Sequence, residues 1–481
     1  MNVRSIDEAV GVPLASVGLP VASPPLVVDL DGTLVKTDLL LESILALIRK
    51  QPLCVFQLPV WLLRGKAAFK QEVARRVELD IRSLPWRREL LDDLERQHAQ
   101  GRSLVLATGS DMRLARQVAD HLGIFDLVFA SDGVVNLCGA AKRDHLVRKF
   151  GDRGFDYAAD GGGFARHDVA VWASARRAII VNSEFKVQSR PGAWERLNAL
   201  RPTHWLKNLL VFVPVFAAHR FYEIASLEKS LLAFVAFGCC ASSGYLLNDL
   251  LDLEADRHHP KKRLRPFAAG NLPLSYALVM IPALLVLGCL LGGLVSTPLL
   301  GILLVYFAMS AAYSLHLKKI PILDVLFLAG LYTVRIMAGS AAVSLWLSPW
   351  LTAFSIFLFF SLALVKRYAE LVITRLADGE AMKARPYEAS DGELLAAMGT
   401  ASGYLAVLVL ALYAASDKAP LLYSRSQLLW FLCPLLLYWI SHVWLTAHRG
   451  KMHHDPLIFA ITDKTSRVLS LLMLAVAMAA L

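Results

Sequence analysis

Three aspartates lie among five basic residues in the segment NDLLDLEADRHHPKKRLR, residues 248–265. Asp249, Asp252 and Asp256 follow one another at i, i+3 and i+7, so a helix would place their carboxylates on one face. Mg²⁺ binds carboxylate oxygens and often completes its shell with substrate phosphates and water. The basic residues that begin at Arg257 would then lie beside those phosphates. We expect this segment to bind Mg²⁺ and a diphosphate; a solvated, charged loop is the alternative.

A second pair of carboxylates, Asp29 and Asp31, ends the apolar run in LVVDLDGTLVKTD. Such a run indicates a buried parallel strand that opens into a loop at its carboxyl end. Two acids at this position can supply a nucleophile and a proton donor for phosphoryl transfer through an aspartyl phosphate. A further apolar strand at residues 103–107 is followed by a Thr-Gly-Ser turn beginning at Thr108. This turn offers a hydroxyl and backbone amides to phosphoryl oxygens.

The order of these motifs, followed by Lys142 and by an acid at Asp160, resembles the haloacid dehalogenase phosphatase superfamily over residues 24–185. The resemblance implies a Rossmann-like α/β fold with a helical cap at about residues 34–100. The implied roles are nucleophile for Asp29, general acid/base for Asp31, phosphoryl contacts for Thr108 and Lys142, and Mg²⁺ ligands for Asp29, Asp31 and Asp160.

The last motif departs from the usual pattern of this superfamily, because the next acid after Asp160 is Asp168, beyond a run of three glycines. The second metal ligand is therefore left open. A domain retained only as a scaffold is the alternative to an active phosphatase.

The remaining composition indicates a membrane protein with one soluble domain. The chain has 481 residues, 56% of them hydrophobic, and its long apolar runs begin after about residue 205. Against the roughly 20 apolar residues that a span needs, we count about nine candidates. They lie near residues 207–222, 228–250, 272–294, 297–316, 320–343, 347–366, 395–416, 427–447 and 464–481. The expected division is a tail at 1–23, the α/β domain at 24–185, a linker at 186–204 and an all-α transmembrane bundle at 205–481.

Charge placement predicts how the chain lies in the membrane. The net charge is +10, but the basic residues cluster in short loops on one side of the expected spans, which sets topology and argues against nucleic-acid binding. We expect a multi-pass protein of the inner membrane, with the N-terminal domain and active sites on the cytoplasmic side. The six cysteines show no metal-binding spacing and indicate a reducing compartment. Residues 53–63 are apolar but too short to span, so a core or interfacial helix is expected there.

Four segments of the C-terminal part, residues 201–212, 248–256, 313–319 and 364–371, resemble the UbiA-type prenyltransferase superfamily. The closer likeness is to its decaprenyl-phosphate phosphoribosyltransferase branch, over about residues 195–481. This resemblance implies transfer of 5-phosphoribosyl from phosphoribosyl pyrophosphate to a polyprenyl phosphate, with release of pyrophosphate. It implies a Mg²⁺ and pyrophosphate site at Asn248, Asp249, Asp252 and Asp256. Weaker candidates for phosphate contacts are Lys207, Arg257, Lys261, Arg265, Tyr313, Lys318, Arg335 and Lys366.

One departure from the wider superfamily bears on the donor. Its ordinary members carry a second acidic pair on a later helix, whereas Asp324 is followed by Val-Leu-Phe-Leu. The many basic residues suit a donor that bears a diphosphate and a separate phosphate. Arg335, deep in an apolar span, is expected to face the bundle interior and an anion, or else to pair with Asp324 or another helix residue.

Three functions remain open from the sequence. The first is the phosphoribosyltransferase with a fused phosphatase that removes the 5-phosphate, feeding the synthesis of arabinose- or ribose-containing cell wall glycans. The second is a prenyltransferase that uses a polyprenyl diphosphate and an aromatic or other acceptor. The third is a membrane scaffold without catalytic activity.

Overall fold

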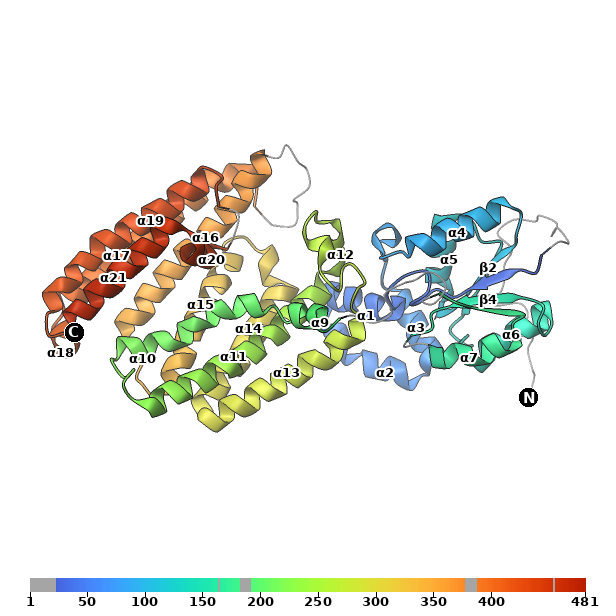
Figure 1. The fold of residues 1–481 in the computed structure, drawn as a ribbon, viewed down its shortest axis with the longest axis horizontal. Coiled ribbons are helices and arrows are strands. Elements are labelled where there is room, and N and C mark those ends of the chain that lie inside the picture. Colours follow the sequence, from blue (N-terminus) through green and yellow to red (C-terminus); the bar gives the residue numbers. More distant parts are fainter. Residues whose placement is uncertain (1–22, 163–164, 182–191, 377–386, 453–454) are drawn as a thin grey trace. The chain divides into compact units, whose positions relative to one another are not determined.

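The structure is a computed structural model that describes residues 23–162, 165–181, 192–376, 387–452 and 455–481 (Figure 1). The chain divides into two compact units. The first holds the described residues up to Ala199 together with Asp249–Leu278, and the second holds Leu200–Asn248 and Val279–Leu481. The segment with the three aspartates thus belongs to the first unit, although it lies far along the sequence.

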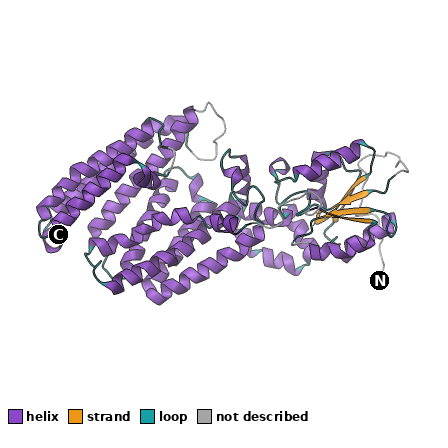
Figure 2. Cartoon of the chain, viewed as in Figure 1, coloured by secondary structure: helices purple, strands orange, loops and turns teal. Residues whose placement is uncertain are grey.

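The first unit is built on a five-stranded parallel sheet in the order β3-β2-β1-β4-β5, drawn in orange in Figure 2. In register, Val27 lies opposite Val105 on one side and Tyr157 on the other. The strands are β1 (Leu26–Val28), β2 (Leu104–Asp111), β3 (Leu127–Ser131), β4 (Asp156–Ala159) and β5 (Arg177–Ile180). The expected α/β domain with a parallel sheet is confirmed.

Both faces of this sheet are covered, as near-continuous apolar strands require. Alternate residues point to opposite faces, so Leu26 and Val28 join one buried cluster while Val27 joins the other. Helix α5 (Met112–Leu122) contributes to the first cluster. The second cluster includes residues of α6 (Ala140–Phe150) and α7 (Ala165–Ser174).

The segment between β1 and β2 is helical, in the region where a helical cap is expected. Helix α1 begins after Asp38, whose side chain accepts a hydrogen bond from the amide of Leu41, the usual role of an N-terminal cap. The elements are α1 (Leu39–Lys50), η1 (Pro52–Phe56), α2 (Leu58–Leu63), α3 (Lys66–Ala74), η2 (Ile81–Ser83) and α4 (Arg88–Ala99).

The second unit is helical throughout its described part. Its elements are η3 (Pro202–Phe212), α10 (Val213–Ala217), α11 (Ile224–Leu251), α13 (Leu274–Val295), α14 (Thr297–Leu315), η5 (Leu317–Lys319), α15 (Leu323–Ala342), α16 (Pro349–Leu376), η7 (Ala389–Asp391), α17 (Gly392–Ala414), α18 (Ala419–Leu422), η8 (Ser426–Phe431), α19 (Leu432–His448), α20 (Pro456–Thr462) and α21 (Lys464–Ala480). The first unit also receives the end of α11, then α12 (Leu253–His258), η4 (Lys262–Leu264) and the start of α13.

Among the described residues, six helical segments are long and apolar enough to cross a membrane. They are Ile224–Leu251, Leu274–Val295, Thr297–Leu315, Leu323–Ala342, Gly392–Ala414 and Ser426–His448. The count of about nine is not confirmed. The expected span at 207–222 is wrong, because this stretch forms the 3-10 helix η3 and the five-residue helix α10. The expected spans at 347–366 and 464–481 lie in α16 and α21, which are not among the six.

Helix α15 lies at the centre of the second unit. In its most apolar window 67% of residues are buried, against 11% for α13, so α13 presents most of its surface outward. Polar side chains on α15, such as Asp324 and Arg335, are therefore enclosed by protein. Charged groups at membrane depth are tolerated in such surroundings.

Candidate functional site

The helix that the aspartate spacing predicts is interrupted at Asp252. Helix α11 ends at Leu251, and Asp252, with φ −102° and ψ 11°, separates it from α12. The prediction of one continuous helix is therefore wrong. Asp252 occupies the N-cap position of α12, although its side chain makes no capping hydrogen bond there.

Asp249 and Asp256, one on each side of this interruption, still converge on a single cation. Both carboxylates are buried, and both accept a hydrogen bond from Nη1 of Arg265, at 3.2 Å for Asp249. Burial raises the pKa of Asp256, and Arg265 opposes this shift. Two carboxylates directed at one positive charge suit a divalent cation that binds a diphosphate. No three His, Cys, Asp or Glu side chains in the described part of the chain form a metal-binding group.

Arg257, predicted to contact phosphate, is ion-paired with Glu42 of α1. Its Nη1 and Nη2 donate to the two carboxylate oxygens of Glu42 at 2.8 and 2.5 Å, and both side chains are buried. A bidentate pair of this kind fixes the orientation of both partners. In this structure the Arg257 side chain therefore holds the aspartate segment against α1 and is already committed to a carboxylate.

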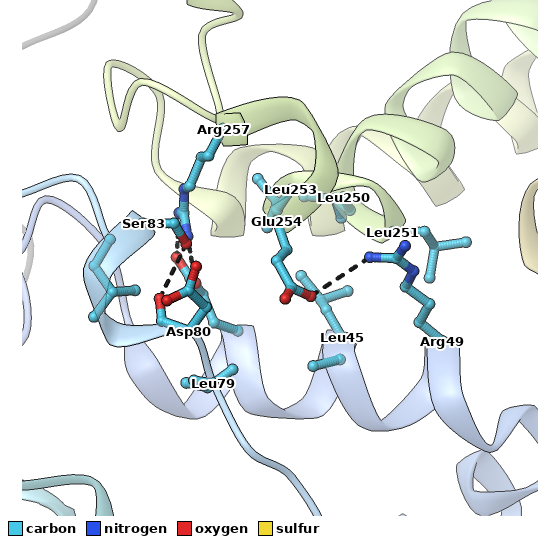
Figure 3. Close-up of a pocket in the computed structure, with 13 residues that line it drawn as sticks. Leu45, Arg49, Leu79, Asp80, Ser83, Leu250, Leu251, Leu253, Glu254 and Arg257 are labelled. Carbon is cyan, nitrogen blue, oxygen red and sulfur yellow. Dashed lines mark hydrogen bonds and ion pairs between the residues drawn. The ribbon is translucent and has the colours of Figure 1, made fainter. Parts of the chain in front are cut away.

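Figure 3 shows the small pocket that this pairing closes, with a volume of about 40 Å³. Arg49 on α1 and Glu254 on α12 form a second ion pair at 3.7 Å. Between the ion pairs the lining is largely leucine, including Leu45 and Leu253. The pocket is too small for a substrate and marks a packed contact.

The other residues predicted near the aspartates occupy less enclosed positions. Asn248 is half-buried near the end of α11, and Lys261 is exposed in the loop after α12. The Lys261 backbone amide donates to the ring of His259 at 3.2 Å.

The strand-end acids of the sheet form a second cluster. Lys142 on α6 donates to Asp29 at 2.8 Å and to the hydroxyl of Tyr157 at 3.0 Å, and it lies 3.4 Å from Asp168. All four side chains are buried. Burial tends to lower the pKa of Lys142, but Asp29, Tyr157 and Asp168 together raise it well above its usual value. Lys142 is therefore a fixed cation beside Asp29.

Asp31, the second strand-end acid, has its own set of hydrogen-bond donors. It accepts hydrogen bonds from the hydroxyls of Ser110 at 2.6 Å and Thr108 at 3.3 Å, and from the backbone amide of Leu39 at 2.8 Å. Gly32 follows with φ 74°, the left-handed conformation that lets the chain turn after the strand. Burial raises the pKa of Asp29 and of Asp31 to about 6. An acid with such a pKa is suited to donate and accept protons near neutral pH.

The cavity beside these acids has a volume of about 190 Å³. Lys70 of α3 reaches into it and donates to the carbonyl of Gly109 and to Asn136, the latter at 2.8 Å. The cavity is lined by acids, bases and glycines that include Asp29, Asp31, Asp38, Lys70, Gly109, Ser110, Lys142 and Asp168. Its four carboxylates outnumber its two lysines, so a phosphate ester would enter this cavity only together with a cation.

Asp160, predicted as a metal ligand, lies next to this cluster but does not line the cavity. Its amide donates to Thr33 at 3.0 Å, and Thr33 in turn donates to Asp29 at 3.4 Å. Its carboxylate lies 3.7 Å from Arg87, a buried residue that no sequence motif indicates. Sequence reasoning also missed Lys70, because no motif distinguishes it within the helical segment between β1 and β2. Asp168 was noted only as the next acid, and its contact with Lys142 depends on where α7 packs.

In the second unit, Lys207 and Lys366 share one acid. Lys207 donates to Asp455 at 2.7 Å and to the hydroxyl of Tyr332 at 3.1 Å, while Lys366 lies 3.5 Å from Asp455. Lys207 and Asp455 are about nine-tenths buried. Sequence reasoning missed Asp455, although an acid between two apolar segments was a usable signal.

Arg335 is buried in the interior of the second unit, as predicted. Its guanidinium donates to Asn208 at 3.0 Å, to the hydroxyl of Tyr306 at 3.1 Å and to the carbonyl of Leu331. It also lies 5.0 to 5.5 Å from the ring centres of Phe237, Tyr306 and Tyr332, within the range of cation–π attraction. Of the alternatives to an anion, pairing with Asp324 is not observed, because Asp324 pairs with Arg367, whereas Asn208 and Tyr306 are partners from other helices.

Asp324 pairs with Arg367 of α16. The Nε of Arg367 donates to Asp324 at 2.6 Å, and Nη2 donates to the hydroxyl of Tyr313 at 2.8 Å. Tyr387 also donates to Asp324. Lys318 is also buried and lies in η5, a few residues before Asp324 in the sequence. Tyr313, predicted to contact phosphate, thus serves in this structure as an acceptor for Arg367.

Removing one partner of the buried pair should destabilise the protein strongly. The side chains of Arg367 and Asp324 are 1% and 0% exposed, and removing one partner of a buried pair costs about 3–5 kcal/mol. Because Arg367 also pairs with Glu370 at 2.8 Å, the lower end of this range is expected. We expect Asp324→Asn to lower the free energy of unfolding by this amount in detergent. The double variant Asp324→Leu with Arg367→Met should lose less, because neither charge remains. Wild-type stability of Asp324→Asn would contradict a structural role for the pair.

Comparison with known proteins defines the family. Residues 209–460, more than half of the chain, match the UbiA prenyltransferase family. An uncharacterized protein y4nM of Sinorhizobium fredii is 33% identical over 461 residues, covering 92% of this chain and 88% of that protein. Nodulation protein NoeC of Azorhizobium caulinodans is 38% identical over 276 residues, covering 56% of this chain and 88% of the relative. A decaprenyl-phosphate phosphoribosyltransferase of Mycobacterium tuberculosis is 32% identical over 287 residues, covering 58% of this chain and 91% of the relative.

The matched region contains the apolar helices, and together they identify a multi-pass membrane protein. From the extent of the family match and the identity to these relatives, the chain belongs to the UbiA prenyltransferase family.

Proposed function

We propose that the chain transfers 5-phosphoribosyl from phosphoribosyl pyrophosphate to a polyprenyl phosphate, releasing pyrophosphate. The observation that carries this is the likeness to a decaprenyl-phosphate phosphoribosyltransferase over 91% of that relative's length. The paired carboxylates of Asp249 and Asp256 support it, since a diphosphate donor needs such acids for its metal.

In the proposed reaction, Mg²⁺ held by Asp249, Asp256 and Asp252 would stabilise the charge on the leaving pyrophosphate. Two of the three acids suit this role, because the buried carboxylates of Asp249 and Asp256 already meet at one cation, the Arg265 guanidinium; Asp252 would have to join them when the metal binds. Arg265 would turn from the carboxylates toward the pyrophosphate. A guanidinium can bind two oxygens of a phosphate group at once. Asn248 would orient the donor from the preceding position on α11. The phosphate of the lipid acceptor is already anionic, so the attack on the anomeric carbon needs no strong base.

Lys207 and Lys366 of the second unit would bind the phosphate of the lipid acceptor. Lys207 and Lys366 both contact Asp455, and a phosphate could replace this acid as their partner. Tyr313, Lys318, Lys261 and Arg335 remain proposed phosphate contacts, as does Arg257 if its pairing with Glu42 opens.

The surroundings of Asp324 favour phosphoribosyl transfer over prenyl transfer from a polyprenyl diphosphate. Asp324 is fully buried and bound by Arg367 and Tyr387, so it serves packing in this structure. A second metal-binding acid pair of the usual kind has no counterpart in the sequence at this position.

We further propose that the N-terminal domain removes the 5-phosphate to give polyprenyl-phosphoryl ribose. Asp29 would attack the phosphorus atom, with Lys142 and Thr108 binding phosphoryl oxygens. Asp31 would protonate the leaving ribose oxygen and then activate the water that cleaves the aspartyl phosphate, as its raised pKa supports. Asp29 and Asp31 would hold Mg²⁺ there, whereas Asp160 is engaged with Arg87. Both reactions would take place on the cytoplasmic side of the inner membrane, a proposal that the clustering of basic residues in short loops supports.

The purified protein in detergent tests the proposal directly. It would be given phosphoribosyl pyrophosphate, Mg²⁺ and a polyprenyl phosphate, with pyrophosphate release as the readout. Release that depends on the lipid supports the transferase. Turnover only with a polyprenyl diphosphate supports prenyl transfer instead, and no turnover with either donor, in folded protein, supports a scaffold.

Lys207→Met should weaken binding of the lipid acceptor more than it slows the chemical step. The change removes a cation but leaves Lys366 beside Asp455, so we expect the KM for the polyprenyl phosphate to rise about tenfold, the effect of losing roughly 1.4 kcal/mol of binding. Lys229→Met, an exposed lysine on α11, is the matched control. An unchanged KM in Lys207→Met would show that this residue does not bind the lipid phosphate.

A further inference from the structure

The helical segment of the first unit exposes an apolar surface that its own packing leaves uncovered. We define this surface, the η1–α2 patch, by six residues that are 43 to 88% exposed: Leu53, Val55, Phe56, Val60, Leu62 and Leu63. Isolated exposed apolar residues are ordinary. Six within residues 53–63 are a local concentration of exposed apolar side chains, and apolar surface gathered in this way marks sites of interaction.

The patch is held in place by the residues between its members. Cys54 and Trp61 point inward and join Leu47, Phe69 and Val73 in a small buried core. Figure 1 shows α2 beside α3, to which it is connected by a single turn. The outward side chains are therefore presented by a fixed scaffold, and their exposure is a property of the fold.

The charged residues in the segment that carries the patch are all basic, and Glu72 of α3, which lies near Arg64, is paired with Arg76. Residues 50–66 contain Lys50, Arg64 and Lys66 and no acid, and all three basic side chains are exposed. An apolar surface bordered by basic residues fits the interface of a bilayer that contains anionic lipids, because leucine and phenylalanine enter the acyl boundary while lysine and arginine meet the headgroups.

A membrane is available to this surface, since the same chain carries six helices able to cross one. We propose that the η1–α2 patch inserts into the lipid interface and presents the Asp29 cavity to a phosphate on a membrane lipid. This inference rests on the proposed phosphatase function for its substrate.

The path from the patch to the cavity is short along the chain. Helix α3 follows α2 directly, and its Lys70 lines the cavity and binds Gly109 and Asn136. Helix α1, which precedes the patch, is capped by Asp38, another residue of the cavity lining. Insertion of the patch would therefore set the distance between the cavity and the headgroup layer.

Photo-crosslinking tests the membrane contact without reference to catalysis. The full-length protein would carry benzoylphenylalanine in place of Leu63 and be reconstituted in vesicles of phosphatidylcholine and phosphatidylglycerol. We expect lipid adducts, read by mass spectrometry, at least about tenfold above those from the same substitution at Val134. Val134 is the matched control, being 88% exposed, as Leu63 is, but outside the patch. Equal labelling at both positions, or crosslinks to a second copy of the chain, would overturn the proposal.

A kinetic experiment tests what the contact does. In vesicles, the double variant Phe56→Glu with Leu63→Glu should hydrolyse the 5-phosphate of a polyprenyl-linked ribose about tenfold more slowly than wild type. Its hydrolysis of the soluble ester p-nitrophenyl phosphate should be unchanged, which also verifies folding, and Val134→Glu should match wild type on both substrates. Equal loss on both substrates would refute a membrane role. If wild type hydrolyses neither ester, the phosphatase function fails, while the crosslinking result still decides the membrane contact.

Discussion

Asp249→Asn is expected to lower lipid-dependent pyrophosphate release by at least a hundredfold. The substitution removes one of the two carboxylates that converge on Arg265, and a single well-placed electrostatic contact to developing charge is worth about 3–4 kcal/mol. Asp252→Asn should act in the same direction, because its carboxylate completes the proposed metal site. Initial rates with saturating phosphoribosyl pyrophosphate and Mg²⁺ would measure both.

Two controls make this result specific. Glu228→Gln removes an exposed carboxylate near the other end of α11 and should leave pyrophosphate release unchanged. Hydrolysis of p-nitrophenyl phosphate should survive in Asp249→Asn, since Asp29 and Lys142 are untouched. Near-normal release by Asp249→Asn would show that the leaving group is bound elsewhere.

The second large effect is expected from Asp29→Asn. An amide cannot form the aspartyl phosphate, so this variant should still make the phosphoribosyl lipid but leave its 5-phosphate in place. Mass spectrometry of the lipid products would show the wild-type and variant products differing by one phosphate. Loss of hydrolysis should be at least about ten-thousandfold, because removing a covalent nucleophile can cost on the order of 10⁶ in kcat.

Asp92→Asn, on the exposed side of α4, is the matched control and should process the lipid as wild type does. If the wild-type protein yields only the phosphorylated lipid and Asp29→Asn changes nothing, the N-terminal domain does not act on this product. The transferase proposal would stand in that case, because pyrophosphate release is measured independently.

The strand-end acids were predictable because their position follows from local pattern. Parallel strands end at one edge of a sheet, so the acids after β1 and the Thr108 turn in β2 had to meet there. Thr108 and Ser110 do contact Asp31. The apolar helices were predictable for a similar reason, since length and hydropathy are properties of a segment by itself. The span at 207–222 failed because Pro214 and a short apolar run favour a broken, 3-10 backbone.

Spacing along the chain determined which acids could face the same way, but tertiary packing decided what they contact. Asp249 and Asp256 meet Arg265 across a kink at Asp252, and Arg257 turns to Glu42, a residue more than two hundred positions away. Lys207 meets Asp455 across 248 positions, and Asp324 meets Arg367 across 43. Buried charges must be paired, so the sequence determines that each of these groups has a partner. Which partner it has depends on how distant helices pack, and no local pattern carries that information.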